Sequence, residues 1–355
     1  MKLSVLSVAY PLARVGPDAV GGAEQILGAL DHGIAHGGHS SYVLAVEGSD
    51  VAGTLVPLPQ PQGAFDAHVI ARARARCRAA IEETIRTRRI DVVHMHGVDF
   101  HAYLPSPGPA VLATLHLPAS WYPKDALNPH RPRTWLNCVS RSQHESIAAN
   151  AHLLPPIPNG TAVDAVPTVG RKRNFVLVLG RICPEKGIHL ALDAAKTARV
   201  PLILAGDVFP YREHQDYFKS MVQPRLGFSR RYIGPVGRKR KRALLAAARC
   251  LLVASLVPET SSLVALEALA AGTPVVAFGK GALPEVIEHG RTGFLASNMH
   301  ELVDGIRAAQ AIDPAQCSAV ARERFSLPRM VDRYLAVYRA LADGQSAASL
   351  QTAAA

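Results

Sequence analysis

The chain has 355 residues, of which 48% are hydrophobic and 19% are charged, and it carries a formal net charge of +11. This length exceeds what one hydrophobic core usually supports, so we expect a globular protein with two domains of ordinary size. No apolar run reaches the roughly 18 residues of a membrane span, and the N-terminus lacks a signal-peptide cleavage pattern, which argues against an integral membrane protein and favours the cytoplasm.

The basic excess attracts phosphates of any kind, whether in nucleotides, nucleic acids or lipid head groups. Its densest cluster is the run of five cations at residues 238–242. A solvated face explains these charges best, and transient contact with an anionic membrane surface is the alternative that they leave open. No aromatic interleaving or nucleic-acid motif accompanies them, so no nucleic-acid partner is expected.

Short apolar runs alternate with helical patterns through the first half of the sequence, which is typical of α/β architecture with parallel sheets. Residues 48–63 are polar and rich in Pro, and are expected to form a loop. The predicted strands are residues 3–9, 41–46, 90–94, 110–115 and 135–140, and the predicted helices are residues 25–36, 65–88 and 143–151.

Gly21 and Gly22 open the first of these helices, where a glycine pair lets the backbone approach a diphosphate or a substrate closely. An ordinary glycine turn is the equal alternative. His94 and His96 stand at the end of a strand, but no third ligand arrives at helical spacing, so a metal site is not favoured. His116 follows the next strand and is a better candidate for a functional side chain at the edge of the sheet.

Residues 155–160 break the pattern, and a polar connection runs on from them. The second half then restarts with strands and helices in alternation. The predicted strands are residues 175–179, 201–205, 231–233, 250–254 and 275–278, and the predicted helices are residues 188–198, 242–248, 263–271 and a closing amphipathic helix within 325–341.

Arg181 and Lys186 bracket a loop between a strand and a helix. Two cations and a helix N-terminus there would converge on the space that a pyrophosphate occupies. Routine surface charge is the alternative.

Residues 258–276 place Glu259 in a strand-to-helix loop and Glu267 on the following helix. Carboxylates so placed can each accept hydrogen bonds from pairs of sugar hydroxyls. The hydroxyls of residues 260–262 are expected to cap the helix, which would leave backbone N–H groups pointing toward a ligand.

Several motifs are absent. The sequence contains no G-x-G-x-x-G after a strand, no G-x-x-x-x-G-K-[ST] and no G-x-S-x-G. Dinucleotide oxidoreductases, P-loop enzymes and serine hydrolases are therefore disfavoured. Five scattered cysteines show no C-x-x-C and no metal-ligand spacing, so we expect reduced thiols.

Taken together, the residues resemble the retaining GT-B glycosyltransferases of family 4. The most specific match is the E-x7-E motif from Glu259 to Glu267, followed by the P-E-V-I-E-x-G-x-T-G-F-L run of residues 284–295. Shorter matches are GGAE at 21–24, ATLH at 113–116, NGTAVD at 159–164 and GRICPEKG at 180–187.

The resemblance implies that Glu267 binds the ribose hydroxyls, that Glu259 holds hydroxyls of the donor sugar, and that Arg181 and Lys186 stabilise the diphosphate leaving group. It also implies a catalytic position for His116 beside the reacting sugar. The remaining donor-binding positions that it implies are Gly21 and Gly22 beside the phosphates, and Ser261, Ser262 and Leu263, the last two through backbone N–H groups.

The implied enzyme is a hexosyltransferase that moves a sugar from a UDP- or GDP-linked donor to an acceptor hydroxyl, with no metal or other cofactor. The alternatives are a non-catalytic sugar- or nucleotide-binding protein and a related epimerase or phosphorylase. Many family members carry Phe-Gly where this chain has Ser261 and Ser262, which leaves the donor sugar and its geometry open, and the acceptor and oligomeric state are open as well.

The implied fold is GT-B, with two Rossmann-like domains whose parallel sheets face each other across a cleft. We expect an acceptor-binding domain at residues 1–163, a donor-binding domain at 164–326, a helix at 327–342 that crosses back to the first domain, and a disordered tail at 343–355.

Overall fold

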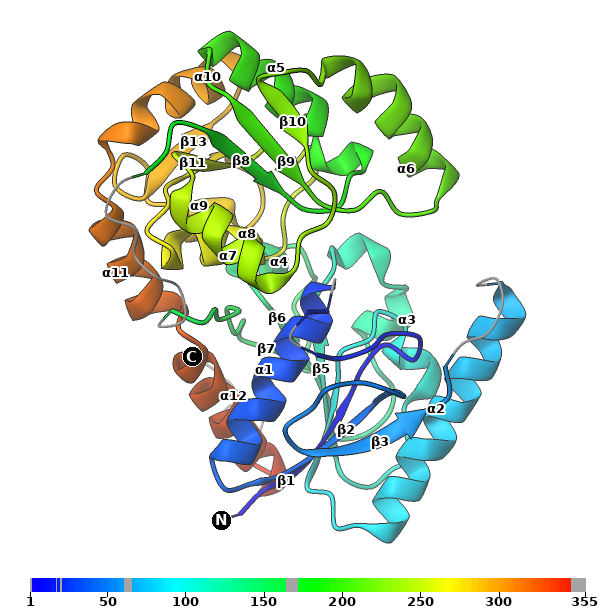
Figure 1. Ribbon diagram of the computed structural model, residues 1–355. Helices are drawn as coiled ribbons and strands as arrows, with labels where there is room; N and C mark the ends of the chain where they lie inside the picture. The colour runs from blue at the N-terminus through cyan, green and yellow to red at the C-terminus, as the bar shows by residue number, and fades with distance from the viewer. Residues whose placement is uncertain (1, 17, 20, 61–65, 164–171, 346–355) are drawn as a thin grey trace. The chain divides into compact units, whose positions relative to one another are not determined.

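The computed structural model describes residues 2–16, 18–19, 21–60, 66–163 and 172–345 (Figure 1). The chain forms two compact units, of which the first comprises Met1–Asn159 with Pro328–Ala355 and the second comprises Gly160–Leu327. The boundary thus falls slightly before the expected residue 163, and the closing helix belongs to the first unit. Most of the expected tail lies outside the described residues.

The first unit is built on a seven-stranded sheet with the order β3-β2-β1-β4-β5-β6-β7, in which every recorded pairing is parallel. Its elements are β1 (Ser4–Val8), α1 (Gly22–His36), β2 (Ser40–Val46), β3 (Thr54–Leu58), α2 (Ala67–Thr87), β4 (Val92–Met95), η1 (Phe100–Tyr103), β5 (Ala110–Leu115), η2 (Ala119–Trp121), α3 (Lys124–Leu127), β6 (Thr134–Cys138), α4 (Arg141–Glu145), β7 (Leu153–Leu154) and α12 (Leu327–Ala342).

The second unit has a six-stranded parallel sheet with the order β10-β9-β8-β11-β12-β13. Its elements are β8 (Val176–Leu179), η3 (Pro184–Lys186), α5 (Ile188–Ala198), β9 (Leu202–Ala205), α6 (Arg212–Tyr217), η4 (Phe218–Val222), η5 (Gln223–Arg225), β10 (Arg230–Tyr232), α7 (Arg238–Ala247), β11 (Cys250–Val253), α8 (Leu263–Ala270), β12 (Val275–Phe278), α9 (Leu283–Val286), β13 (Gly293–Ala296), α10 (Met299–Ala308), η6 (Ala309–Ala311) and α11 (Pro314–Phe325).

The second sheet is buried on both faces. Alternate residues of β11 point to opposite sides, so that Leu252 packs in the core beneath α5 and α10 while Leu251 packs in the core beneath α7, α8 and α11. Strands covered by helices on both faces read as continuous apolar runs. This is why the α/β architecture with parallel sheets was predictable, and the structure confirms it.

Several expected boundaries were wrong. The expected loop at 48–63 contains β3, which is the edge strand of the first sheet and pairs with β2. Pro57 stands in this strand, and a proline is tolerated at an edge because its missing N–H faces no partner strand. The helix expected at 143–151 is shorter and ends at Glu145. The helix expected at 242–248 begins earlier, at Arg238, the first residue of the basic run.

Among the described residues, no helix combines the length and the apolar character that crossing a membrane requires. All five cysteines are free and buried, in line with the expected reduced thiols.

Candidate functional site

Lys186 and Glu259 meet at the carboxyl edge of the second sheet. Lys186 lies in η3 after β8 and Glu259 follows β11, and these two strands are neighbours. The Nζ of Lys186 lies 2.7 Å from Oε1 of Glu259, and the hydroxyl of Ser255 donates to the same oxygen. Only 10% of the Glu259 side chain is exposed. The structure thus brings together one predicted cation and one predicted carboxylate.

The loop carrying Lys186 is held closely against the neighbouring strand. Gly187 has φ 59°, and a Cβ there would lie 2.1 Å from the carbonyl oxygen of Ala254. Only glycine fits a left-handed position at such a close approach. A hydrogen bond from Leu256 N to Glu185 O, 2.7 Å long, fastens the same two segments together.

The second predicted carboxylate has a different lysine partner. Glu267 lies on α8, and its Oε1 is 2.5 Å from the Nζ of Lys241 on α7. Lys241 belongs to the basic run of residues 238–242. The run was recognised in the sequence, but the pairing of Lys241 with Glu267 was not. Lys241 was therefore not predicted as a residue of this site.

The start of α8 differs from the expected hydroxyl cap. Ser262 occupies the N-cap position with φ 62° and ψ 69°, and its own side chain makes no capping hydrogen bond. A residue whose side chain caps a helix normally has an extended backbone, from which the side chain reaches the first N–H groups. Ser262 has a left-handed backbone instead, so its side chain does not reach them. Within the described residues, the Ser262 Oγ is buried without a hydrogen-bond partner. Ser261 is also buried, and Leu263 begins the helix.

Arg181, the other predicted cation, is partly buried in the same loop as Lys186. Its guanidinium carbon lies 5.8 Å from the centre of the Phe209 ring. Within the part of the chain that the structure describes, it forms no ion pair with a carboxylate. Its charge thus adds to the positive potential of this loop.

In the first unit, His116 directly follows β5 and contacts a second histidine. Its Nε2 lies 3.0 Å from Nδ1 of His96. Burial lowers the pKa of His116 to about 4, so its imidazole is neutral at physiological pH. The pKa of His96 is also lowered, chiefly by burial.

His94 is a core residue. It hydrogen-bonds through Nδ1 to the hydroxyl of Tyr338 on α12 at 2.6 Å, and through Nε2 to Thr114 Oγ1 at 2.7 Å. Because both ring nitrogens have partners, His94 helps to hold α12 on the first sheet.

Gly21 is the N-cap of α1 and Gly22 its first residue. A Cβ on Gly21 would lie 1.9 Å from a carboxylate oxygen of Glu24. The absence of a side chain there makes room for this carboxylate, whose pKa is raised by burial.

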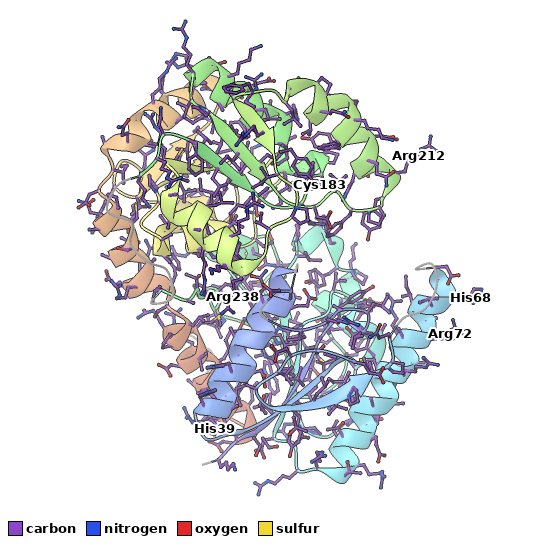
Figure 2. All side chains as sticks on the ribbon, in the orientation of Figure 1. His39, His68, Arg72, Cys183, Arg212 and Arg238 are labelled. Carbon is purple, nitrogen blue, oxygen red and sulfur yellow. The ribbon has the colours of Figure 1, made fainter. Side chains whose placement is uncertain are left out.

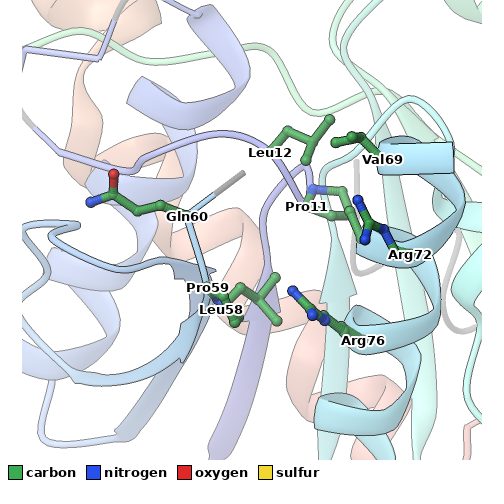
Figure 3. A pocket seen from close by; sticks show the side chains of 9 residues that line it. Pro11, Leu12, Leu58, Pro59, Gln60, Val69, Arg72 and Arg76 are labelled. Atoms are coloured by element: carbon green, nitrogen blue, oxygen red, sulfur yellow. The ribbon is translucent and has the colours of Figure 1, made fainter. Parts of the chain in front are cut away.

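The first unit also has a cavity of about 240 Å³ (Figure 3). Two exposed arginines on α2, Arg72 and Arg76, face it across the ends of the first and third strands. Its other lining residues are Pro11, Leu12, Leu58, Pro59, Gln60, Val69 and Ala73. None of these residues was in the predicted site.

Residues 163–323 match the family model described as Glycosyl transferases group 1. The D-inositol 3-phosphate glycosyltransferase of Mycolicibacterium smegmatis (strain ATCC 700084 / mc(2)155) is 33% identical over 191 residues, which is 51% of this chain and 43% of that relative. The matched part therefore spans less than half of the relative's length.

Solved structures of other proteins resemble nearly the whole chain. AviGT4, a glycosyltransferase involved in avilamycin A biosynthesis, has a TM-score of 0.74 and 25% identity, covering 96% of this chain and 98% of AviGT4. Anabaena Alr3699/HepE in complex with UDP-glucose has a TM-score of 0.70 and 18% identity, covering 96% of this chain and 99% of that protein. The chain thus has the GT-B fold of glycosyltransferases, and its residues 163–323 match the family model of the glycosyl transferases group 1.

Proposed function

We propose that this protein is a retaining glycosyltransferase that moves a sugar from a nucleotide-diphosphate sugar to an acceptor hydroxyl without a divalent metal. The observation that carries the proposal is the ion pair between Lys186 and Glu259. It lies at the carboxyl edge of a parallel sheet, where α/β proteins bind their ligands, and within the segment that matches the glycosyltransferase family.

In this proposal the carboxylates hold the donor. Glu267 accepts hydrogen bonds from the ribose hydroxyls, and Glu259 accepts them from the sugar. Lys241 and Lys186 fix the orientation of these carboxylates before the donor binds, because each lysine already contacts one carboxylate oxygen. The backbone N–H groups of Ser262 and Leu263 lie at the start of α8, where a helix favours anions.

Arg181 and Lys186 supply positive charge for the diphosphate that leaves. Charge that is already in place where negative charge develops lowers the barrier without reorganisation during the reaction. Two cations from the same loop can supply the positive charge that a metal ion supplies in other enzymes. In the first unit, a neutral His116 hydrogen-bonds the reacting sugar rather than pairing with a charge, and Gly21 and Gly22 lie beside the phosphates.

The donor is proposed to be UDP- or GDP-linked, and UDP-glucose is the first to test because Anabaena Alr3699/HepE, which shares the fold, was solved with it. A thermal-shift series against UDP, GDP, ADP and their sugars would identify the donor, since a ligand that binds only the folded state raises the melting temperature with its concentration. Glu267→Ala should abolish that shift. The proposal fails if no nucleotide or nucleotide sugar stabilises the wild-type chain.

Product analysis separates transfer from its rivals. A transferase with the proposed chemistry gives a glycoside with the donor's anomeric configuration, and slow hydrolysis of the donor when the acceptor is missing. An epimerase or a phosphorylase gives a different product. Tight nucleotide binding without turnover against a broad acceptor panel would instead support a binding protein.

A further inference from the structure

Cys183, Glu185 and His214 bring a thiol, a carboxylate and an imidazole together in the second unit. One potential ligand atom of each lies within 4.8 Å of the other two. We propose that these three side chains bind a zinc ion. This inference does not rest on the proposed glycosyl transfer.

The site joins two separate segments of the chain. Cys183 has an extended backbone and immediately precedes η3, the short turn that contains Glu185. His214 comes from α6, after β9. Figure 2 labels Cys183 in this unit. Two ligands from one tight turn and a third from another element form a pattern that the scattered cysteines of the sequence did not reveal.

The burial of these side chains fits a ligand role. Cys183 is 1% exposed and His214 is 8% exposed. Within the described residues, Nδ1 of His214 is buried and has no hydrogen-bond partner. A buried polar atom without a partner is uncommon in folded proteins, and the lone pair of a neutral imidazole nitrogen is a ligand that zinc accepts.

The chemistry of the three groups favours zinc over the harder cations. Thiolate and imidazole are ligands typical of zinc, whereas magnesium and calcium prefer oxygen alone. A tetrahedral zinc ion holds its ligand atoms roughly 3.5 Å apart, and the three candidate ligand atoms already lie within 4.8 Å of one another. One thiolate and one carboxylate neutralise the charge of the ion, and three protein ligands leave the fourth position for water.

Cys183 could instead act as a reactive thiol, but the surroundings of its side chain oppose that role. Burial, followed by a hydrogen bond to Glu185, raises the pKa of Cys183 to about 11, which keeps the sulfur protonated and a poor nucleophile at neutral pH. Zinc would displace this proton to solvent, and its affinity would therefore rise with pH.

Aromatic rings surround His214. The ring centres of Phe209 and Tyr211 lie 6.2 and 5.2 Å from that of the imidazole. Phe209 also lies beneath the guanidinium of Arg181. A zinc ion would fasten α6 to the turn that contains Glu185, and it would limit the movement of this loop.

The test measures cobalt binding to the full chain. The purified protein is freed of nucleotide, stripped of metal with a chelator and then titrated with Co²⁺. A thiolate ligand gives a sulfur-to-cobalt charge-transfer band in the near ultraviolet, and tetrahedral geometry gives intense visible bands. We expect both in the wild-type chain, with a stoichiometry of one, and displacement by Zn²⁺. Cys183→Ser should remove the charge-transfer band. His214→Ala should weaken Zn²⁺ binding by more than the roughly 10- to 100-fold that follows loss of an outer-shell partner.

Cys250→Ala and His300→Ala are matched controls. Cys250 is a buried free cysteine of β11, and His300 is a largely exposed histidine of α10. Both variants should keep the cobalt spectrum, and circular dichroism should show that all four variants fold. The proposal is overturned if the wild-type chain gives no charge-transfer band, or if Cys183→Ser keeps it. Neither result depends on finding a sugar donor.

Discussion

Lys186 and Glu259 lie 73 positions apart in the sequence, and their side chains form an ion pair 2.7 Å long. Parallel pairing of β8 with β11 places the loops after these strands side by side. Because Ser255 donates to the same carboxylate oxygen, the orientation of Glu259 is fixed from two sides. A group held in this way is preorganised for binding and catalysis.

Replacing either partner should therefore reduce turnover. We expect Lys186→Ala and Glu259→Ala each to lower kcat by about 10²- to 10³-fold, the effect of removing one preorganised electrostatic group. Far-UV circular dichroism should remain that of the wild type. Lys239→Ala, which removes an exposed cation of α7, should keep the original kcat. Wild-type turnover in both site variants would contradict the assignment.

Ser262 has a left-handed backbone at the start of α8, with φ 62°. A residue with a Cβ pays about 1–2 kcal/mol for this conformation, whereas glycine adopts it readily. We expect Ser262→Gly to raise the free energy of unfolding by about 0.5–1 kcal/mol after the added chain entropy of glycine is subtracted. Ser262→Ala is the control, because it removes the hydroxyl and keeps the Cβ. Urea denaturation measures the free energy of unfolding of both variants. A glycine variant less stable than the alanine variant would contradict the proposed backbone strain at Ser262.

Much of this arrangement was predictable because parallel sheets leave a strong pattern in sequence. The limits of α5 (188–198) were predicted as observed, since an apolar helical period is bounded there by Gly187 and Arg199. β3 was missed because its five residues include Pro57 and are only partly buried, so they lack the continuous apolar run of an inner strand.

The contacts of the site were less predictable than its residues. The E-x7-E spacing singled out Glu267, but its pairing with Lys241 depends on how α7 packs beside α8, which no local pattern encodes. The left-handed backbone of Ser262 was hidden for a different reason. Serine is a common N-cap residue, so its identity pointed to a conventional cap.

Gly33 allows α1 to pack closely on α12. A Cβ at this position would lie 2.6 and 2.7 Å from the two methyl carbons of Val331. Gly28, on the same helix, would place its Cβ 3.5 Å from Val15, an ordinary contact. The two glycines thus form a matched pair within one element.

Alanine should therefore act in opposite directions at these two positions. Gly28→Ala should stabilise the chain by up to about 1 kcal/mol through helix propensity. Gly33→Ala gains the same propensity but overpacks the interface, which costs about 1–3 kcal/mol, so we expect a net loss. Adding Val331→Ala should recover part of that loss in thermal or urea unfolding. Equal effects of the two single substitutions would show that the α1–α12 contact is looser than the structure indicates.

His116 should make the protein sensitive to acid, because its pKa is lowered in the folded chain. Burial lowers the pKa of His116 from 6.5 to about 4, while the unfolded chain takes up the proton near 6.5. A group with a lowered folded-state pKa contributes its full stability above pH 6.5 and loses it as the pH falls toward 4. At pH 5 the loss from His116 alone should be about 2 kcal/mol relative to pH 7.5.

Urea unfolding at both pH values measures this loss, and His116→Asn should lose less stability than the wild type by that amount. An equal loss in the wild type and His116→Asn would mean that the imidazole of His116 takes up a proton as readily in the folded chain as in the unfolded one.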